Sequence, residues 1–187
     1  MVVVTGTPGT GKTKFSMRLA KKIGAQCVSF GRLVEMERLY SKFDRSRNSK
    51  IVDTTKARSY LSKLASEIEH MIIVDSHVSG ICPKKFTKQV FVLRCEPSVL
   101  EKRLRHRGWN ERKIEENVLA EILDICLSEA IDEYGLRMVR QLITSRSDVE
   151  HCVRFAERIL SGKKTKKVSV DWLSGVALDT SSKYLRR

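Results

Sequence analysis

The amino-acid sequence predicts an α/β fold of the P-loop nucleoside triphosphatase class, in which helices cover both faces of a parallel sheet. Two observations carry this prediction: a strand leads into a glycine-rich loop at the start of the chain, and apolar strand patterns alternate with helical patterns after it. Alternation of this kind is typical of parallel sheets, whose strands are continuously apolar because both faces are covered.

The first element is a short strand followed by a phosphate-binding loop. Residues 2–5 read VVVT, a β-branched run that favours a buried strand. Residues 6–13 read GTPGTGKT and match the pattern G-x-x-x-x-G-K-[ST] without a gap. A helical pattern follows and ends at Gly24. Strand, loop and helix together form the context that this motif requires.

Each residue type in the loop has a mechanical reason. Glycines such as Gly9 and Gly11 let backbone N–H groups approach a polyphosphate closely. The helix that follows presents its positive N-terminal end to the anion. Lys12 is expected to reach the β- and γ-phosphate oxygens of ATP, and the Thr13 hydroxyl to ligate Mg²⁺. The loop therefore predicts a nucleoside triphosphate site.

The remaining elements follow in alternation along the chain. The patterns predict strands at 27–30, 71–75, 89–93 and 138–143, and helices at 31–43, 54–69, from 97, from about 112 to 134, and at 148–160. After Gly162 the pattern stops, and residues 163–187 carry seven Lys or Arg against two Asp. We therefore predict a kinase domain at 1–162 and a basic C-terminal tail at 163–187.

Asp75 and His77 follow a buried apolar strand, in the segment IIVDSH. The carboxyl ends of parallel strands open onto the ligand crevice, so Asp75 is a candidate Mg²⁺ ligand beside the loop. The alternative role for Asp75 is a turn or a cap. His77 is a candidate for orienting a water or a phosphate oxygen, and a structural histidine is an equal alternative.

Two further segments suit nucleotide binding. Arg103 and Arg107 lie four residues apart in RLRHRGWNERK, so they share one helical face beside a glycine hinge. Such a segment suits a small closing lid that brings guanidinium groups to the phosphoryl group, and a solvated basic loop is the alternative. Asp44, Arg47 and Asn48 lie in a polar insert at 43–53, which either grips an acceptor nucleotide or is a surface loop.

The composition limits the partners and the location. The 187 residues include 36 Lys or Arg and 22 Asp or Glu, a formal net charge of +14. Such an excess favours nucleic acid or an RNA-rich assembly as a partner, and a well-solvated surface is the alternative. Five cysteines without a CxxC pair predict reduced thiols in the cytoplasm. No apolar run approaches 18 residues, and the first strand leaves no room for a signal peptide, so we expect no membrane association.

Several motifs together resemble one family. GTPGTGKT, VDSH, LRCEP, RLRHRGW, KIEENVLAEI and DWL occur in this order over nearly the whole chain. They resemble the adenylate kinase isoenzyme 6 family of adenylate-kinase-like ATPases. The resemblance implies a five-stranded parallel sheet flanked by helices, a nucleoside monophosphate (NMP) segment at about 29–53 and a short LID at about 106–116.

The resemblance also implies residue roles. Gly9, Gly11, Lys12, Thr13 and Lys14 match positions that bind the ATP phosphates. Arg107 matches the LID arginine that binds ATP, with Arg103 beside it, and Arg146 falls near the loop that holds the adenine of ATP. In the NMP segment, Arg32, Asp44 and Arg47 are expected to contact the acceptor.

The implied function is reversible phosphoryl transfer from ATP to AMP or another NMP, with Mg²⁺, together with intrinsic ATPase activity. The family also implies a role in late maturation of the small ribosomal subunit, through a small-subunit ribosomal protein on a pre-ribosomal particle with its rRNA, and a nuclear location in a eukaryote. The alternative is an ATP-switched assembly factor whose transfer to AMP is incidental. A metabolite kinase of the shikimate kinase type is disfavoured by the VDSH and RGW segments.

Overall fold

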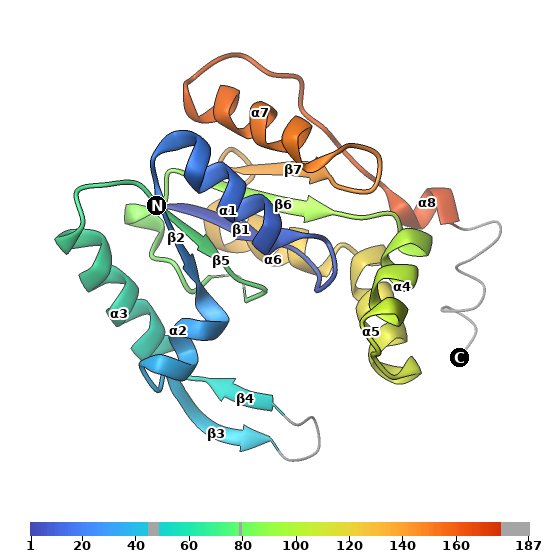
Figure 1. Cartoon of the computed structure of the whole chain (residues 1–187), viewed down its shortest axis with the longest axis horizontal. Helices are drawn as coiled ribbons and strands as arrows, with labels where there is room; N and C mark the ends of the chain where they lie inside the picture. Colours follow the sequence, from blue (N-terminus) through green and yellow to red (C-terminus); the bar gives the residue numbers. More distant parts are fainter. Residues whose placement is uncertain (45–48, 79, 177–187) are drawn as a thin grey trace.

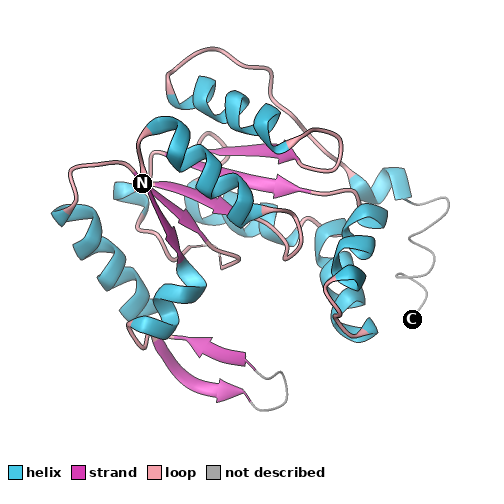
Figure 2. Ribbon diagram, in the orientation of Figure 1, coloured by secondary structure: helices cyan, strands magenta, loops and turns pink. Residues whose placement is uncertain are grey.

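The computed structural model describes residues 1–44, 49–78 and 80–176. At its centre is a five-stranded parallel sheet with the order β2-β5-β1-β6-β7 (Figures 1 and 2). The strands are β1 (Val2–Thr5), β2 (Gln26–Ser29), β5 (Ile72–Asp75), β6 (Gln89–Arg94) and β7 (Val139–Ile143). The predicted α/β fold of the P-loop class is confirmed.

Helices cover both faces of the sheet, and alternate side chains of each strand enter two separate cores. In β1, Val2 and Val4 pack with helices α1 (Lys12–Ile23) and α7 (Val149–Leu160). Val3 points to the other face, which is covered by α2 (Phe30–Met36), α3 (Thr54–Glu67) and α6 (Ile125–Tyr134) (Figure 1). The three central strands β1, β5 and β6 are therefore buried at every residue, as expected of strands that are covered on both faces.

The predicted long helix from 112 to 134 is wrong, because the segment forms two helices. Helix α5 (Glu111–Ile122) ends at Leu123, and α6 begins after Asp124. Asp124 has a φ of 56°, the left-handed conformation that a continuous helix does not contain. Its carboxylate forms an ion pair with Arg94, a contact that the helical periodicity of the sequence does not reveal.

The predicted helix at 31–43 is also wrong in its second half. Helix α2 ends at Met36, and Arg38 turns the chain with a φ of 52°. Strands β3 (Tyr40–Asp44) and β4 (Ser49–Val52) then form an antiparallel hairpin that extends away from the main sheet (Figure 1). The polar insert at 43–53 is therefore largely part of this hairpin, and its residues 45–48 lie outside the described residues.

Two helical segments stand at the carboxyl ends of the strands. Helix α4 (Pro97–His106) packs against α5 around a small core of its own. Beyond α7, residues 163–171 form neither helix nor strand, and the short helix α8 (Trp172–Val176) then packs on α5. Trp172 is only 4% exposed, so the C-terminal segment is anchored on the core at this residue. A short 3₁₀ helix (Lys84–Phe86) precedes β6.

Candidate active site

The P-loop connects β1 to α1 and depends on glycine at three positions. Gly6 has a φ of 136°, and a Cβ there would lie 2.4 Å from the Leu93 carbonyl oxygen. At Gly9, with a φ of 95°, a Cβ would lie 2.7 Å from a methyl group of Leu100. Gly11 precedes the first turn of α1 with a φ of 94°. Gly6 and Gly9 therefore let the loop pass close to β6 and α4, and Gly11 is needed for its positive φ alone.

Lys12 is folded back over its own loop. Its ammonium group donates hydrogen bonds to the carbonyl oxygens of Gly6, at 2.7 Å, and Thr7, at 3.2 Å. Burial lowers the pKa of Lys12, and the negative charge of Asp75 offsets part of this effect. An arriving anion would therefore find a largely desolvated cation already at the loop.

Thr13 and Asp75 meet at the junction of α1 and β5. The Thr13 hydroxyl donates a hydrogen bond of 2.6 Å to Asp75 Oδ2. Asp75 ends a fully buried strand and is itself only 7% exposed. A hydroxyl and a carboxylate this close together are the hard oxygen ligands that Mg²⁺ prefers, with its remaining positions left to water and phosphate. The donor chemistry of this pair therefore fits a magnesium ion.

One cavity of about 530 Å³ collects most of the predicted residues. Its walls are formed by the loop, the start of α1, the segment after β5 and the end of α4, with Pro8, Gly9, Gly11, Lys12, Thr13, Lys14, Met17, His77 and Arg107. The His77 side chain reaches solvent, yet the surrounding protein atoms lower its pKa, and the charge of Lys12 lowers it further. A neutral imidazole therefore faces this cavity at neutral pH.

A second cavity of about 640 Å³ adjoins the first and shares Gly9, Gly11, Lys14 and Arg107 with it. It extends between α1, α4 and the loop from β7 to α7. Arg103 on α4 donates to the Thr144 carbonyl oxygen at 3.1 Å and approaches the Gly9 carbonyl oxygen at 3.4 Å, so it is fixed against the loop. Among the described residues the guanidinium of Arg107 has no such partner, which leaves it available to a ligand.

Arg146 and Arg32, two other candidate residues, do not line these two cavities. The guanidinium of Arg146 lies over the ring of Trp172, 5.5 Å from its centre. Arg32 is exposed on α2. Asp44 is the last residue of β3, and Arg47 lies outside the described residues.

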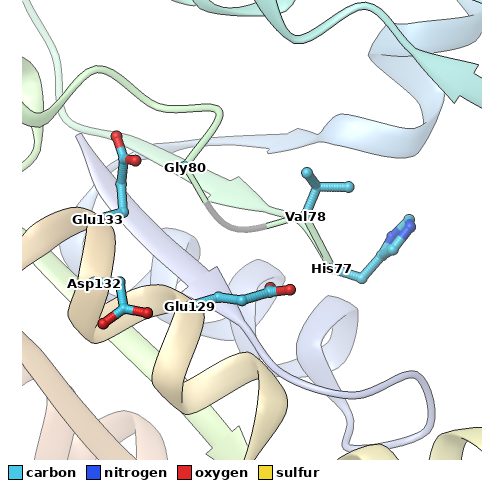
Figure 3. Close-up of a pocket in the computed structure, with 6 residues that line it drawn as sticks. All are labelled: His77, Val78, Gly80, Glu129, Asp132 and Glu133. Carbon is cyan, nitrogen blue, oxygen red and sulfur yellow. The ribbon is translucent and has the colours of Figure 1, made fainter.

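A third cavity, of about 520 Å³, has the opposite charge. Figure 3 shows it between the loop after β5, with His77, Val78 and Gly80, and helix α6, which contributes Glu129, Asp132 and Glu133. Glu133 pairs with Arg58, whose Nη2 lies 2.6 Å from a carboxylate oxygen. His77 therefore lies at the boundary between a cationic cavity beside the P-loop and an acidic cavity beside α6.

Sequence reasoning missed the support behind the P-loop. The Thr7 hydroxyl donates a hydrogen bond of 2.6 Å to Glu121 on α5, and Glu121 is 2% exposed. Helical periodicity alone gives no sign of this, because a glutamate between apolar residues of an amphipathic helix is ordinarily solvated. The one available signal is Arg94, a charged residue that ends the apolar run QVFVL and proves to be the partner of Glu121.

The fold and the glycine loop define a P-loop kinase. A family model described as an AAA domain matches residues 2–124. Shikimate kinase from Bacteroides thetaiotaomicron has a similar structure, with a TM-score of 0.57 at 17% identity over 86% of this chain and 97% of that chain. Deoxyadenosine kinase from M. mycoides gives a TM-score of 0.50 at 15% identity over 86% and 98%. These two likenesses show the fold alone.

Two relatives in sequence are more specific. A protein of Methanocaldococcus jannaschii named "Putative adenylate kinase" is 34% identical over 171 residues, 91% of this chain and 92% of that protein. The "Adenylate kinase isoenzyme 6 homolog" of Caenorhabditis elegans is 35% identical over 141 residues, 75% of this chain and 78% of that protein. The chain belongs to this adenylate kinase isoenzyme 6 family, which confirms the resemblance found in the sequence.

Proposed function

We propose that the protein is a nucleoside monophosphate kinase that transfers the γ-phosphoryl group of ATP to AMP or a related NMP. The observation that supports this most is the pair of adjoining cavities, which share Arg107 and the glycine loop. The larger one suits the donor nucleoside, because it extends from the loop along α1 and α7. The other suits the phosphates, because Lys12, Thr13, Lys14 and Arg107 line it.

The chemistry of transfer needs positioning and charge stabilisation more than it needs a base. The acceptor is itself an anionic phosphate, so no strong general base is required. Lys12 would exchange the carbonyl oxygens of Gly6 and Thr7 for the β- and γ-phosphate oxygens. Arg107 would neutralise charge that develops on the transferring group, and Arg103 would hold the loop through Gly9.

Thr13 and Asp75 would hold Mg²⁺. The Thr13 hydroxyl and the Asp75 carboxylate are hydrogen-bonded to each other where α1 meets β5, and among the described residues no other such pair joins these two elements. The ion supplies neutralisation of phosphate charge and fixes the orientation of the phosphates. The hydrogen bond from Thr13 keeps the carboxylate turned toward the loop before any ligand arrives.

Hydrolysis of ATP is a second activity that we expect of this site. It requires that a water molecule be oriented toward the γ-phosphate. His77 faces the phosphate cavity, and its lowered pKa keeps the imidazole neutral and able to accept a hydrogen bond from water. We expect His77 to contribute more to hydrolysis than to transfer onto AMP.

The acidic cavity restricts where the acceptor phosphate can lie. The carboxylates of α6 would repel a phosphate, although Arg58 offsets the charge of Glu133, so we place the phosphates of both nucleotides on the loop side of His77. Arg32 on α2, Asp44 at the end of β3 and Arg47, which lies outside the described residues, remain our candidates for acceptor contacts in the NMP segment.

A second candidate function rests on the charge of the molecule. A net charge of +14 exceeds what a polyphosphate site needs and favours an RNA-rich partner. We propose that ATP turnover acts on such an assembly, in small-subunit ribosome maturation with a ribosomal protein and rRNA, in the cytoplasm or nucleus. No helix in the described residues is long and apolar enough to cross a bilayer.

Timed production of ADP tests the kinase. The rate is measured with MgATP alone and then with AMP, CMP, UMP or GMP added. We expect at least one monophosphate to accelerate ADP formation several-fold. If none of the four does, and ADP forms only at the hydrolysis rate, transfer is excluded and the ATP-switched assembly factor remains.

A further inference from the structure

A buried carboxylate connects the P-loop to the C-terminal helix. One oxygen of Glu121, Oε2, accepts the hydrogen bond of 2.6 Å from the Thr7 hydroxyl in the loop. The other, Oε1, accepts a hydrogen bond of 3.2 Å from the indole N–H of Trp172. Both Glu121 and Trp172 are almost completely buried. A single side chain therefore links residue 7 to residue 172.

Glu121 has little freedom to move, because Arg94 holds it from two sides. The Arg94 Nε donates to Glu121 Oε1 at 2.8 Å, and Nη2 donates to the Glu121 carbonyl oxygen at 3.1 Å. The backbone N–H of Cys95 adds a third hydrogen bond, of 3.0 Å. Arg94 is fixed in turn by Gln141 and Asp124. A charged pair satisfied by this many hydrogen bonds is rigid and transmits small displacements.

Trp172 also contacts the loop from β7 to α7, other residues of which line the donor cavity. The guanidinium of Arg146 lies over its ring, and Arg146 belongs to the loop from β7 to α7 that lines this cavity with Thr144 and Ser147. Figure 1 shows how the segment after α7 runs back to bring α8 beside α4 and α5. The indole therefore contacts Glu121, which binds the P-loop, and Arg146, which belongs to the loop from β7 to α7.

We infer that Trp172 and Glu121 are positioning residues of the donor-nucleotide site, through which the C-terminal helix sets the P-loop for ATP. The Thr7 carbonyl oxygen accepts hydrogen bonds from Lys12 and from the Thr10 hydroxyl, so a shift of Thr7 displaces both. The inference rests on the proposed function only for the identity of the ligand, ATP. The C-terminal segment is then a part of the nucleotide site.

The test is a set of matched variants whose affinity for MgATP is measured by calorimetry. Trp172→Phe keeps an aromatic side chain and removes the indole N–H, and Thr7→Val removes the loop hydroxyl at nearly constant shape. Each variant is expected to weaken ATP binding about fivefold. The double variant should lose no more affinity than the single variant with the larger loss, because both substitutions interrupt the same connection. Thr7→Ser retains the hydroxyl and is expected to bind ATP with the affinity of wild type. Leu173→Ala, on the exposed neighbour in α8, stays within twofold of wild type.

Fluorescence gives a readout that a purely structural role would not change. The chain has two tryptophans, so in a Trp109→Phe background Trp172 is the only one, and excitation at wavelengths that tyrosine does not absorb reports on it alone. Saturating MgATP is expected to change its emission, and Thr7→Val to abolish that change while ATP still binds. Thermal unfolding of each variant confirms that it is folded.

The inference alone is overturned if ATP binds but the Trp172 emission does not respond, or if the losses of affinity from Trp172→Phe and Thr7→Val add. If both single variants bind ATP as wild type does, the inference also fails. A wild-type protein that binds no ATP overturns the proposed function as well, so the two failures are distinguishable.

Discussion

The charge of Lys12 lies at the P-loop, and the contacts of its side chain explain why that side chain can be removed without loss of the fold. Its ammonium bonds only to carbonyl oxygens of Gly6 and Thr7, and it contributes nothing to either apolar core. Lys12→Ala is expected to lower the rate of transfer by about 10²–10³-fold, the usual loss when one charge-stabilising contact is deleted. Steady-state rates measure the loss.

Circular dichroism and the midpoint of thermal unfolding provide the control for Lys12→Ala, and both should match wild type. A variant that keeps more than about a tenth of the wild-type rate contradicts a role for Lys12 at the γ-phosphate, since such a contact is worth several kcal/mol.

His77 carries a prediction about protonation. The protein atoms around the imidazole, and then the charge of Lys12, lower the pKa of His77 below its ordinary value of 6.5. A base with a lowered pKa remains neutral until the pH falls further. NMR titration of the nucleotide-free protein should therefore give a midpoint for His77 below 6.5. Lys12→Met should raise that midpoint by removing the positive charge.

A midpoint for His77 at or above 6.5, or one that Lys12→Met leaves unchanged, contradicts the described surroundings of the imidazole.

At the scale of elements, the sequence predicts well where an apolar pattern has one period. Helices α1, α3 and α7 are recognisable because each buries one repeating face, and the strands of the sheet because each is a short apolar run. The errors fall where a single residue overrides the pattern. Arg38 and Asp124 both take left-handed conformations without being glycine, and each ends a helix that the periodicity would continue.

Glycine positions test this reasoning at a helix end. Gly24 ends α1 with a φ of 66°, and no atom lies within 4 Å of a Cβ built there. Gly24→Ala should therefore destabilise the protein by about 1 kcal/mol through backbone strain alone. Gly31, inside α2, also has open space but no positive φ, so Gly31→Ala should stabilise by up to about 1 kcal/mol. Urea unfolding measures both, and shifts of the same sign would contradict the described conformations.

For the whole molecule, the site was predictable where its residues belong to motifs that lie at the carboxyl ends of strands. Six predicted residues converge because parallel strands end at one edge of the sheet: Lys12, Thr13, Asp75, His77, Arg103 and Arg107. Glu121 and Trp172 were not predictable as site residues, because their role comes from a contact across 51 residues of sequence that no local pattern encodes.

The charge of the whole molecule leads to a prediction about RNA. Lys163, Lys164, Lys166 and Lys167 are exposed in the segment between α7 and α8. Replacing all four with Gln should leave phosphoryl transfer unchanged, because none lines the cavities of the site. If they meet RNA phosphates, the slope of log affinity against log salt should flatten by about 3, since each contact contributes about 0.7–0.9. Filter binding at several salt concentrations measures the slope.

A control with the same loss of charge places Gln at Lys21, Lys63, Lys84 and Lys85, which are exposed on other elements. An equal loss of slope in both variants would show that net charge alone attracts RNA. An unchanged slope in the first variant would place the docking surface elsewhere. Truncation after Gly162 is not an adequate test, because it also removes the buried Trp172.

The fate of the γ-phosphate of ATP tests the central claim most directly. The protein is incubated with AMP, Mg²⁺ and ATP labelled in the γ-phosphate, and the products are separated. The site predicts that the label moves to the β-phosphate of ADP formed from AMP, with two ADP for each ATP consumed, and that Lys12→Ala prevents this transfer. Label recovered only as inorganic phosphate, with AMP unchanged, would contradict the kinase.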